Sequence, residues 1–294
     1  MNQRVLVVGC GYVGSQVGVL LVRDGWSVYG LRRDPSRLPV GIHPIAADLR
    51  DQYLRNAISA DDSEDTRLWD AVVYCVGADS RAVEDYQLAY MDGPARIIAA
   101  LGGADRLKHT SLVFVSSTAV YAETAGGWVD ETSALLPRSD PHAHALISGE
   151  EAFLSSAPNA YALRLSGIYG PGRTSLLQRV REGEKHSSPN AKSDRYTNRV
   201  HRDDAAQLIR WLLTERPVPG VFNGSDGEAP PLSTVISGIG SLVGAPVRPF
   251  GGGLQATGKR VSNAKATSAG FRFEYPTFMA GYRALIRHSM DTSS

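Results

Sequence analysis

Three glycines near the amino terminus have the spacing of a phosphate-binding turn. They lie in the segment Gly9-Cys10-Gly11-Tyr12-Val13-Gly14, which follows an apolar run and precedes a helical pattern. In such a unit the first glycine permits the turn, the second lets a pyrophosphate approach the backbone, and the third lets the helix pack closely on the strand. The backbone N–H groups of Tyr12 and Val13 would attract the anion. The segment predicts a dinucleotide site, and an ordinary strand-to-helix connection is the alternative.

Two arginines follow the second strand-like run, where a dinucleotide-binding unit usually carries an acidic residue. That acid accepts a hydrogen bond from the ribose 2′-hydroxyl of NAD. Arg32 and Arg33 occupy this place instead, and a guanidinium pairs bidentately with a 2′-phosphate. We therefore predict NADP as the cofactor. The alternative is that both arginines are solvated loop charges ahead of the turn Asp34-Pro35-Ser36.

The elements that must position these residues alternate between strand and helix patterns. Continuous apolar runs separated by amphipathic helices indicate a parallel sheet covered on both faces, the Rossmann-type doubly wound α/β fold. Ligands gather at the carboxyl ends of such strands, where the strand order reverses. The expected strands are 4–8, 27–31, 43–46, 71–76, 111–115 and 160–165. The expected helices are 12–24, 83–101, 141–155, 174–183, 203–213 and 277–288.

The pattern loosens after Gly170, where glycine and proline become frequent. We expect an NADP-binding Rossmann domain over 1–165. Residues 166–294 are expected to form a smaller, mainly substrate-binding region, interleaved with elements that complete the sheet. Within it, Gly251-Gly252-Gly253 is interpreted as a connector. Asp203 or Asp204 is expected to be the N-cap of the helix 203–213.

Composition excludes several classes of partner. The chain has 294 residues, of which 43% are hydrophobic, and a formal net charge of +1 without a basic run. This balance argues against nucleic acid or an anionic membrane as the main partner. No stretch approaches the roughly 18 unbroken apolar residues of a membrane helix, and the chain begins with a strand pattern, so a cytoplasmic location is expected. Cys10 and Cys75 have no disulfide or metal spacing and are expected on neighbouring inner strands.

Further segments join the glycine turn in a resemblance to a known family. They are Asp48-Leu49, residues 73–78, 128–132, 163–172 and 198–204, and, near the end, residues 259–263 and 270–272. Their order and spacing resemble the extended branch of the short-chain dehydrogenase/reductase superfamily, which contains nucleotide-sugar epimerases, dehydratases and reductases. The resemblance covers almost the whole chain. It implies cofactor contacts from Asp48, Leu49, Cys75, Val76, Gly77, Ser116, Leu165 and Gly167. It implies substrate contacts from Thr118, Tyr121, Tyr169, Asn198, Arg199 and His201.

The resemblance also implies where the reaction would be catalysed. A serine at the end of the fifth strand, matched by Ser117, would hydrogen-bond the reacting oxygen. A Tyr-Lys pair would follow one helical turn apart, but those positions carry His142 and Leu146, so the chain is identified as an atypical member. An imidazole can exchange protons near neutral pH, and we predict that His142, or a bound water in its place, moves the proton. Alternatively, His142 and His144 are only polar residues of a first helical turn, and Ser117 only caps a strand end.

Two functions of different class follow from these residues. The first is an NADP-dependent oxidoreductase or epimerase acting on a small sugar-like or nucleotide-linked substrate, without a metal. The second is a binding protein of the same fold that holds NADP as a sensor or scaffold. Leu146 cannot supply a cation and therefore favours the second function. Ser117, Tyr169 and Asn198-Arg199 favour the first. The two long helices 83–101 and 141–155 could form a homodimer interface, although Ser148 and Gly149 weaken the second helix.

Overall fold

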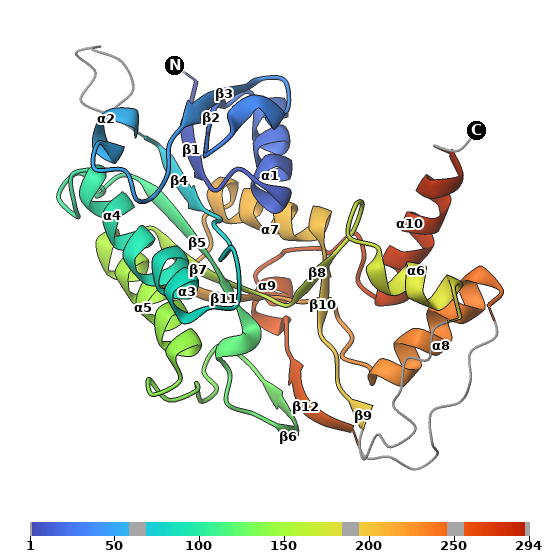
Figure 1. Ribbon diagram of the computed structural model, residues 1–294. Helices are drawn as coiled ribbons and strands as arrows, with labels where there is room; N and C mark the ends of the chain where they lie inside the picture. Colours follow the sequence, from blue (N-terminus) through green and yellow to red (C-terminus); the bar gives the residue numbers. More distant parts are fainter. Residues whose placement is uncertain (1, 59–68, 184–193, 246–255, 292–294) are drawn as a thin grey trace. The chain divides into compact units, whose positions relative to one another are not determined.

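Figure 1 shows a computed structural model of the chain, which describes residues 2–58, 69–183, 194–245 and 256–291. The chain divides into two compact units. The first unit comprises residues 1–120, 135–164 and 206–222, and the second comprises residues 121–134, 165–205 and 223–294. The chain therefore passes between the units several times, and each unit is assembled from separate stretches of sequence.

A seven-stranded sheet forms the frame of the first unit, with its strands in the order β11-β7-β5-β4-β1-β2-β3. Parallel ladders join β1 to β2 and β4, β2 to β3, and β4 to β5. The chain runs from β1 outward to β3 and then returns to the other side of β1 at β4, which is the reversal of a doubly wound fold. The strands are β1 (Arg4–Val8), β2 (Ser27–Arg32), β3 (Ile42–Ala46), β4 (Ala71–Tyr74), β5 (Ser111–Ser117), β7 (Ala160–Leu165) and β11 (Gly220–Gly224).

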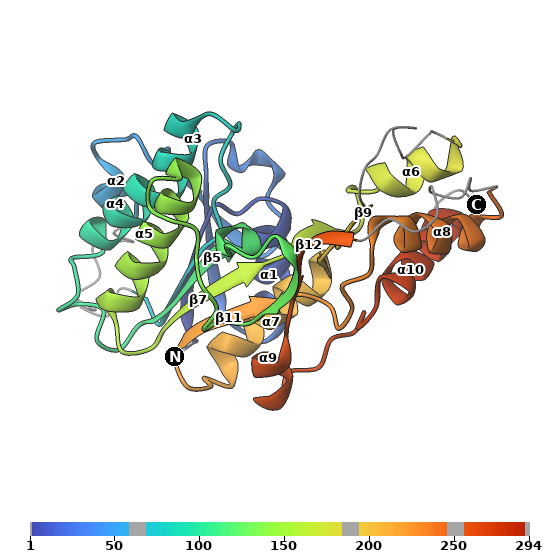
Figure 2. The same ribbon diagram turned by 90° about the horizontal axis from the view of Figure 1, so that it is seen from below.

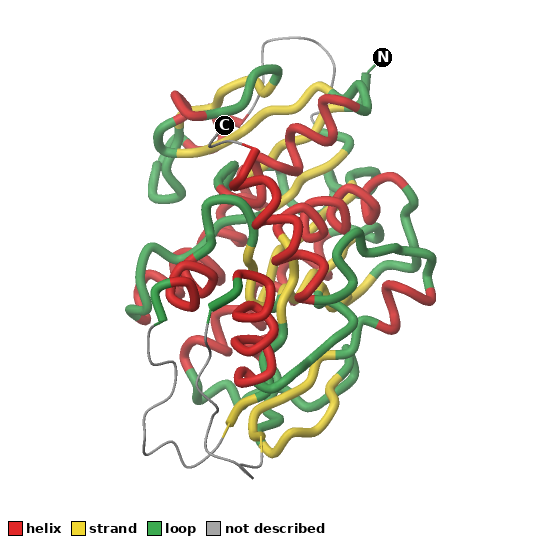
Figure 3. The backbone as a smooth tube through the Cα atoms, turned by 90° about the vertical axis from the view of Figure 1, so that its right-hand side faces the viewer, coloured by secondary structure: helices red, strands yellow, loops and turns green. Residues whose placement is uncertain are grey.

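Helices cover both faces of this sheet, as Figures 1 and 2 show. One face carries α1 (Tyr12–Arg23) and α7 (Arg202–Thr214). The other carries α2 (Leu54–Ile58), α3 (Val83–Gln87), α4 (Gly93–Ala100) and α5 (Pro141–Ser156). The tube in Figure 3 shows the strands enclosed between helices. The sequence prediction of a doubly wound, mostly parallel sheet is confirmed.

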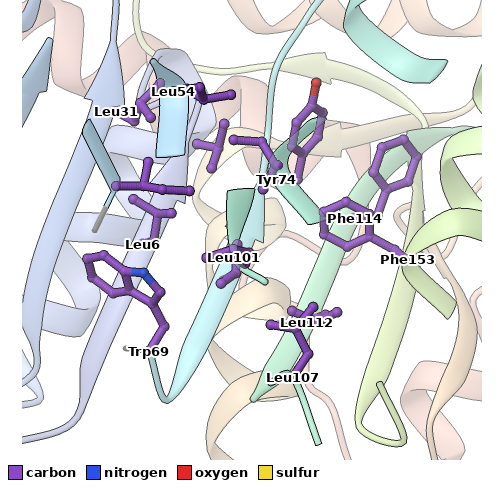
Figure 4. Packing of buried hydrophobic residues seen from close by; sticks show 14 of the residues in the cluster. Leu6, Leu31, Leu54, Trp69, Tyr74, Leu101, Leu107, Leu112, Phe114 and Phe153 are labelled. Atoms are coloured by element: carbon purple, nitrogen blue, oxygen red, sulfur yellow. The ribbon is translucent and has the colours of Figure 1, made fainter. Parts of the chain in front are cut away.

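The core beneath α4 and α5 contains large side chains from the central strands. Tyr74, Phe114 and Phe153 are each fully buried, and the ring of Phe114 lies 5.6 Å from that of Tyr74 and 5.4 Å from that of Phe153 (Figure 4). Every residue of β4 and β7 is buried. Burial on both faces explains why β4 has no polar alternation. The one charged residue of β7, Arg164, forms an ion pair with Glu150 inside this unit.

A π-helical segment, Leu88–Asp92, joins α3 to α4 within the predicted helix 83–101. Such segments free backbone carbonyls from the regular ladder. Tyr74 uses one of them, because its hydroxyl donates to the carbonyl of Ala89 at 2.6 Å. Gly149 of α5 packs against the same segment, where a Cβ would lie only 2.2 Å from the carbonyl oxygen of Tyr90. The glycine in α5 thus permits a close helix contact inside this unit.

The second unit contains two small sheets and a helical layer. β8 (Gly167–Tyr169) pairs in parallel with β10 (Arg199–His201), and the other sheet has the order β6-β12-β9. The bounds of the latter are β6 (Ala125–Val129), β9 (Asp194–Arg195) and β12 (Ala256–Val261). The helices are α6 (Ser175–Arg181), α8 (Leu232–Val243), α9 (Ala264–Ser268) and α10 (Phe278–Asp291). Val235 and Ile239 of α8 pack with Leu177, Tyr282 and Leu285 in the core of this layer.

Three local expectations are changed or lie outside the structure. Neither Asp203 nor Asp204 is the N-cap of α7, because the helix begins at Arg202 and the ring of His201 accepts the N–H of Asp203 at 3.3 Å. The carboxylate of Asp204 accepts instead from the N–H groups of Glu274 and Tyr275. Cys10 and Cys75 lie just after β1 and β4, in the loops and not in the strands. The segment 251–253 lies outside the described residues.

Candidate cofactor and substrate sites

The three glycines of the turn after β1 have different surroundings. Gly9 adopts a φ of +80°, and a Cβ there would lie 2.7 Å from the carbonyl oxygen of Cys75. A Cβ on Gly14 would lie 2.6 Å from the carbonyl oxygen of Gly9. A Cβ on Gly11 would meet nothing nearer than 3.9 Å. The fold itself therefore requires Gly9 and Gly14, whereas the backbone at Gly11 borders open space.

The amino terminus of α1 follows this turn directly. The helix is 12 residues long, starts at Tyr12 and has Gly11 as its N-cap, so no side chain caps it. Its first turn, which includes Val13, contains no acidic residue. The partial positive charge of the helix end therefore faces an approaching anion without a neutralising carboxylate on the helix itself.

The two predicted arginines lie at the same edge of the sheet, at the end of β2. The guanidinium of Arg32 donates to the carbonyl oxygen of Cys10 at 3.3 Å, which holds it against the glycine turn. Arg33 is more exposed and forms a bidentate ion pair with Asp79, with both N–O distances at 2.8 Å. Two arginines therefore lie at the end of β2, and Arg32 contacts the glycine turn.

The other predicted cofactor residues of the first unit follow β3 and β4. The side chain of Asp48 accepts from the backbone N–H of Arg50 and so orders its own loop, and Leu49 beside it is buried. The N–H of Cys75 donates to the carbonyl of Val8 at 2.8 Å, and Val76 and Gly77 follow it. A Cβ on Gly77 would meet nothing within 4 Å. The ends of β1 to β4 therefore bring all these residues to one edge of the sheet.

The hydroxyl residues after β5 have separate partners. Ser116 donates to Glu150 at 2.5 Å, and Glu150 forms an ion pair with Arg164 in which both side chains are 4% exposed. The Ser117 hydroxyl accepts from the N–H of Ala119 at 3.1 Å. Thr118 is buried in the turn that follows. Ser116 thus belongs to a buried charge network, and the observed bond of Ser117 is a local cap.

His142 lies in the first turn of α5, which Asp140 caps by accepting from two backbone N–H groups. Its Nε2 lies 3.0 Å from the carbonyl oxygen of Arg81, and its ring meets that of Tyr86 edge-on at 4.5 Å. A carbonyl only accepts, so Nε2 carries the proton and Nδ1 is left as an acceptor. Among the residues described, no hydrogen bond joins His142 to Ser117. Leu146 is buried in the core and presents no polar group.

The second unit contains a cavity of about 710 Å³. Three of the predicted substrate residues line it, namely Tyr169, Asn198 and Arg199. Gly167, which the sequence predicts as a cofactor contact, lines it as well. Asn198 is held by two backbone bonds, donating to the carbonyl of Lys259 and accepting from the N–H of Val261. The rest of the lining includes Arg173, Thr174, Gln178, Arg195, Thr197 and Tyr282. Three arginines make this cavity cationic, and rings and hydroxyls provide stacking and hydrogen-bonding groups.

Three predicted substrate residues, Thr118, Tyr121 and His201, do not line this cavity within the described parts of the chain. Tyr121 is buried and donates to the side chain of Asn223 at 2.7 Å. His201 is 2% exposed and packs on Tyr275, with ring centroids 4.1 Å apart. Burial lowers the pKa of His201 to about 4, so its ring is neutral at pH 7. Leu165, predicted beside the cofactor, is also buried.

Buried carboxyl groups accompany His201. Burial raises the pKa of Asp226 to about 8. Burial also raises that of Asp204 to about 6, against the opposing effect of the two backbone N–H donors. Burial raises the pKa of the Tyr169 hydroxyl well above its usual value, with the negative charge of Asp226 adding to the effect. At pH 7, Asp226 and His201 are therefore mostly uncharged, whereas Asp204 is mostly ionised.

Sequence reasoning missed Arg173, Arg195 and Tyr282 of the cavity and Asp79 at the cofactor edge. Arg173 directly follows the segment 163–172, whose sequence resembles the family, so its place in the sequence points to the site. Tyr282 lies on the last helix and Asp79 in a loop, and neither has a local pattern that marks it. Their positions depend on contacts between distant parts of the chain.

The family assignment rests on a match over most of the chain. Residues 5–223 match the profile of the NAD dependent epimerase/dehydratase family. The chain belongs to this family. It therefore lies within the extended short-chain dehydrogenase/reductase superfamily, as the sequence resemblance predicts. No helix in the described parts of the chain has the length and apolar character needed to cross a membrane.

Several known proteins and solved structures match this chain over nearly their whole length. Protein YeeZ of Escherichia coli K12 is 24% identical over 283 residues, which cover 93% of this chain and 97% of YeeZ. A Methylobacillus flagellatus structure described as a candidate NAD-dependent epimerase/dehydratase is 27% identical, with a TM-score of 0.81 and coverage of 99% and 100%. The UDP-glucose 4-epimerase of Thermus thermophilus, solved with NAD, is 22% identical with a TM-score of 0.75, covering 97% and 98%. This last likeness shows the shared fold.

Proposed function

We propose that the chain binds NADP in its first unit and acts as an oxidoreductase or epimerase on a nucleotide-linked or sugar-like substrate. The observation that carries the cofactor assignment is the pair Arg32 and Arg33 at the end of β2. Arg32 is held against the glycine turn through Cys10, and the open space at Gly11 supports a pyrophosphate on the backbone. When bound, NADP supplies hydride donor and acceptor chemistry.

The cavity of the second unit supports the substrate assignment. Its arginines suit an anionic group such as a phosphate or diphosphate, because a guanidinium pairs bidentately with such oxygens. Arg199 also donates to the hydroxyl of Thr197 at 2.5 Å, which orders part of the wall. Tyr169 and Tyr282 stack with centroids 4.8 Å apart and give that wall a rigid aromatic surface. The UDP-glucose 4-epimerase named above has a nucleotide-sugar substrate, and we extend that substrate class to this chain.

His142 is proposed to move the proton, with Ser117 orienting the reacting oxygen. The hydrogen bond from Nε2 to the Arg81 carbonyl leaves Nδ1 able to accept a proton, which suits a general base. The Ser117 hydroxyl accepts from the backbone N–H of Ala119, and it keeps its own proton to donate to a substrate oxygen. Both assignments concern groups of the first unit near the carboxyl ends of its strands.

A non-catalytic NADP-binding protein is the second candidate, and one observation favours it. Leu146 is buried where the family's lysine would stand, so no cation is available at that position. The two candidates are separated by incubating the protein with NADP or NADPH and a panel of nucleotide-sugars and ketones. An enzyme changes the absorbance at the nicotinamide band or inverts a sugar carbon. A binding protein retains NADPH and changes none of the panel.

A further inference from the structure

The ion pair between Arg33 and Asp79 crosses the end of the strand that carries the glycine turn. In the sheet, β1 lies between β2 and β4. Arg33 follows β2 and Asp79 follows β4, so their bond bridges the two loops on either side of β1. The register supports this, because Val8 at the end of β1 pairs with both Leu31 and Tyr74. The bridge therefore lies at the edge where adenosine binds in such folds.

We propose that Asp79 is an internal competitor of the 2′-phosphate and so sets how strongly the chain prefers NADP over NAD. This inference rests on the cofactor proposed above. With no dinucleotide present, Asp79 neutralises Arg33 through two hydrogen bonds of 2.8 Å. A 2′-phosphate offers the same bidentate geometry to the guanidinium. Binding then exchanges one anionic partner of Arg33 for another.

The two arginines have different surroundings, which explains why only one would be regulated in this way. Arg32 donates to a backbone carbonyl, that of Cys10. This carbonyl is uncharged, so it does not neutralise the guanidinium that a phosphate would bind. Arg33 is fixed by a carboxylate, and its guanidinium holds the pKa of Asp79 below its usual range, so Asp79 is charged at neutral pH. A second acid, Asp48, pairs with Arg50 of its own loop at 3.4 Å. Asp79 is therefore the acid that pairs directly with Arg33, a residue predicted to bind the phosphate.

The expected size of the effect is modest. The side chains of Arg33 and Asp79 are 61% and 50% exposed, and exposed ion pairs contribute little because water and salt screen them. Releasing Arg33 from Asp79 should therefore tighten binding of a 2′-phosphate by about two- to fivefold. A ligand that lacks this phosphate gains nothing from the release.

The test compares two ligands that differ only in the 2′-phosphate, adenosine 2′,5′-bisphosphate and 5′-AMP, by calorimetry on the full chain. Asp79→Asn should tighten the bisphosphate by about two- to fivefold and leave 5′-AMP unchanged. Asp105→Asn removes another exposed acid, whose side chain is 95% exposed and pairs with Lys108, and should change neither affinity. In an Arg33→Ala background the gain from Asp79→Asn should shrink.

Each other result contradicts the inference in a recognisable way. If Asp79→Asn lowers the affinity for both ligands, the ion pair helps to hold the adenosine and does not compete with the phosphate. If the gain is as large without Arg33, no exchange of partners takes place. If Asp79→Asn changes nothing while the wild type prefers the bisphosphate, the inference fails and the NADP assignment stands. A wild type that binds both ligands equally contradicts the NADP assignment, and the inference with it.

Discussion

Glu150 and Arg164 form an ion pair inside the first unit, with Nη2 and Oε2 2.7 Å apart and both side chains 4% exposed. Arg164 also donates from Nε to Glu150, and Ser116 donates to the same carboxylate. Two charges removed from water are tolerated only when their partners satisfy them. The pair links α5 to β7 and lies beneath the end of β5, so it supports the strand end that carries Ser117.

Removing one member of this pair should destabilise the fold strongly. Glu150→Gln leaves the Arg164 charge buried and uncompensated, which should lower the free energy of unfolding by about 3 to 5 kcal/mol. The neighbouring acid provides a matched control, because Glu151 pairs with Arg138 at the surface. Glu151→Gln should cost less than about 1 kcal/mol. Urea unfolding of both variants checks the difference, and equal losses would contradict the structural role of the buried pair.

Substitutions of two glycines in the turn should separate binding from folding. Gly11→Val should abolish NADPH binding with little change in stability, because its Cβ would meet open space where the pyrophosphate is proposed to lie. Gly14→Val should destabilise the chain, since its Cβ would lie 2.6 Å from the Gly9 carbonyl. Fluorescence titration and thermal unfolding measure the two effects. Retained NADPH binding in Gly11→Val would mean that the turn is not the phosphate site.

These glycines illustrate what the sequence predicts well. The spacing of Gly9, Gly11 and Gly14 is a local property of one strand-turn-helix unit, and the strands and helices on either side have strong periodicity. The position of Arg32 follows from the same unit. By contrast, the partner of Arg33 lies 46 residues further along the chain. Only the order of strands, which brings β4 beside β1, places it there.

The sequence predicts the cavity of the second unit less completely, for a similar reason. Asn198 and Arg199 belong to a segment with a family resemblance, and both line the cavity. Tyr282 lines the same cavity but lies on the last helix, far along the chain from Asn198 and Arg199. No local sequence pattern marks it as a cavity residue. His201 was assigned to the substrate, but its ring accepts the N–H of Asp203 at the start of α7 and is buried. A polar residue in a motif can serve the fold, and only its burial distinguishes the two roles.

The pH dependence of stability should show the raised pKa of Asp226. Its folded-state pKa of about 8 lies above the unfolded value near 3.9, so the folded state holds the proton more tightly and stability falls as pH rises through this window. Asp204 also lowers stability as pH rises, but only up to about pH 6. His201 has the opposite effect: its folded-state pKa of about 4 lies below the unfolded value near 6.5, so it raises stability as pH rises between these values. Between about pH 6.5 and 8, Asp226 therefore changes alone among these three groups.

In that window the wild type should lose up to about 1.4 kcal/mol of stability per pH unit. Asp226→Asn cannot ionise and should flatten the slope, whereas the exposed Asp105→Asn should leave it unchanged. Denaturant unfolding at several pH values measures the slopes. Parallel slopes for wild type and Asp226→Asn would show that Asp226 is already ionised in the folded chain at pH 6.5.

Catalysis by His142 should appear in kcat and not in cofactor affinity. His142→Ala should lower kcat by about a hundredfold or more while NADPH binds almost as before, because the imidazole is proposed to act on the substrate's proton. His144→Ala, in the same helix, should have little effect. Steady-state kinetics and NADPH titration separate the two quantities. Turnover that survives His142→Ala would assign proton transfer to water or another residue.

The central claim is that the cations at the end of β2 select NADP, and paired titrations of NADPH and NADH test it most directly. The wild type should bind NADPH more tightly. Arg32→Ala should lower the affinity for NADPH by about ten- to a hundredfold, because a charge-assisted hydrogen bond of about 1.5 to 3 kcal/mol is lost. The affinity for NADH should remain nearly unchanged. Arg138→Ala, which removes a surface arginine paired with Glu151, should alter neither. Equal affinity of the wild type for NADPH and NADH, or an Arg32→Ala variant that loses no NADPH affinity, would contradict the account.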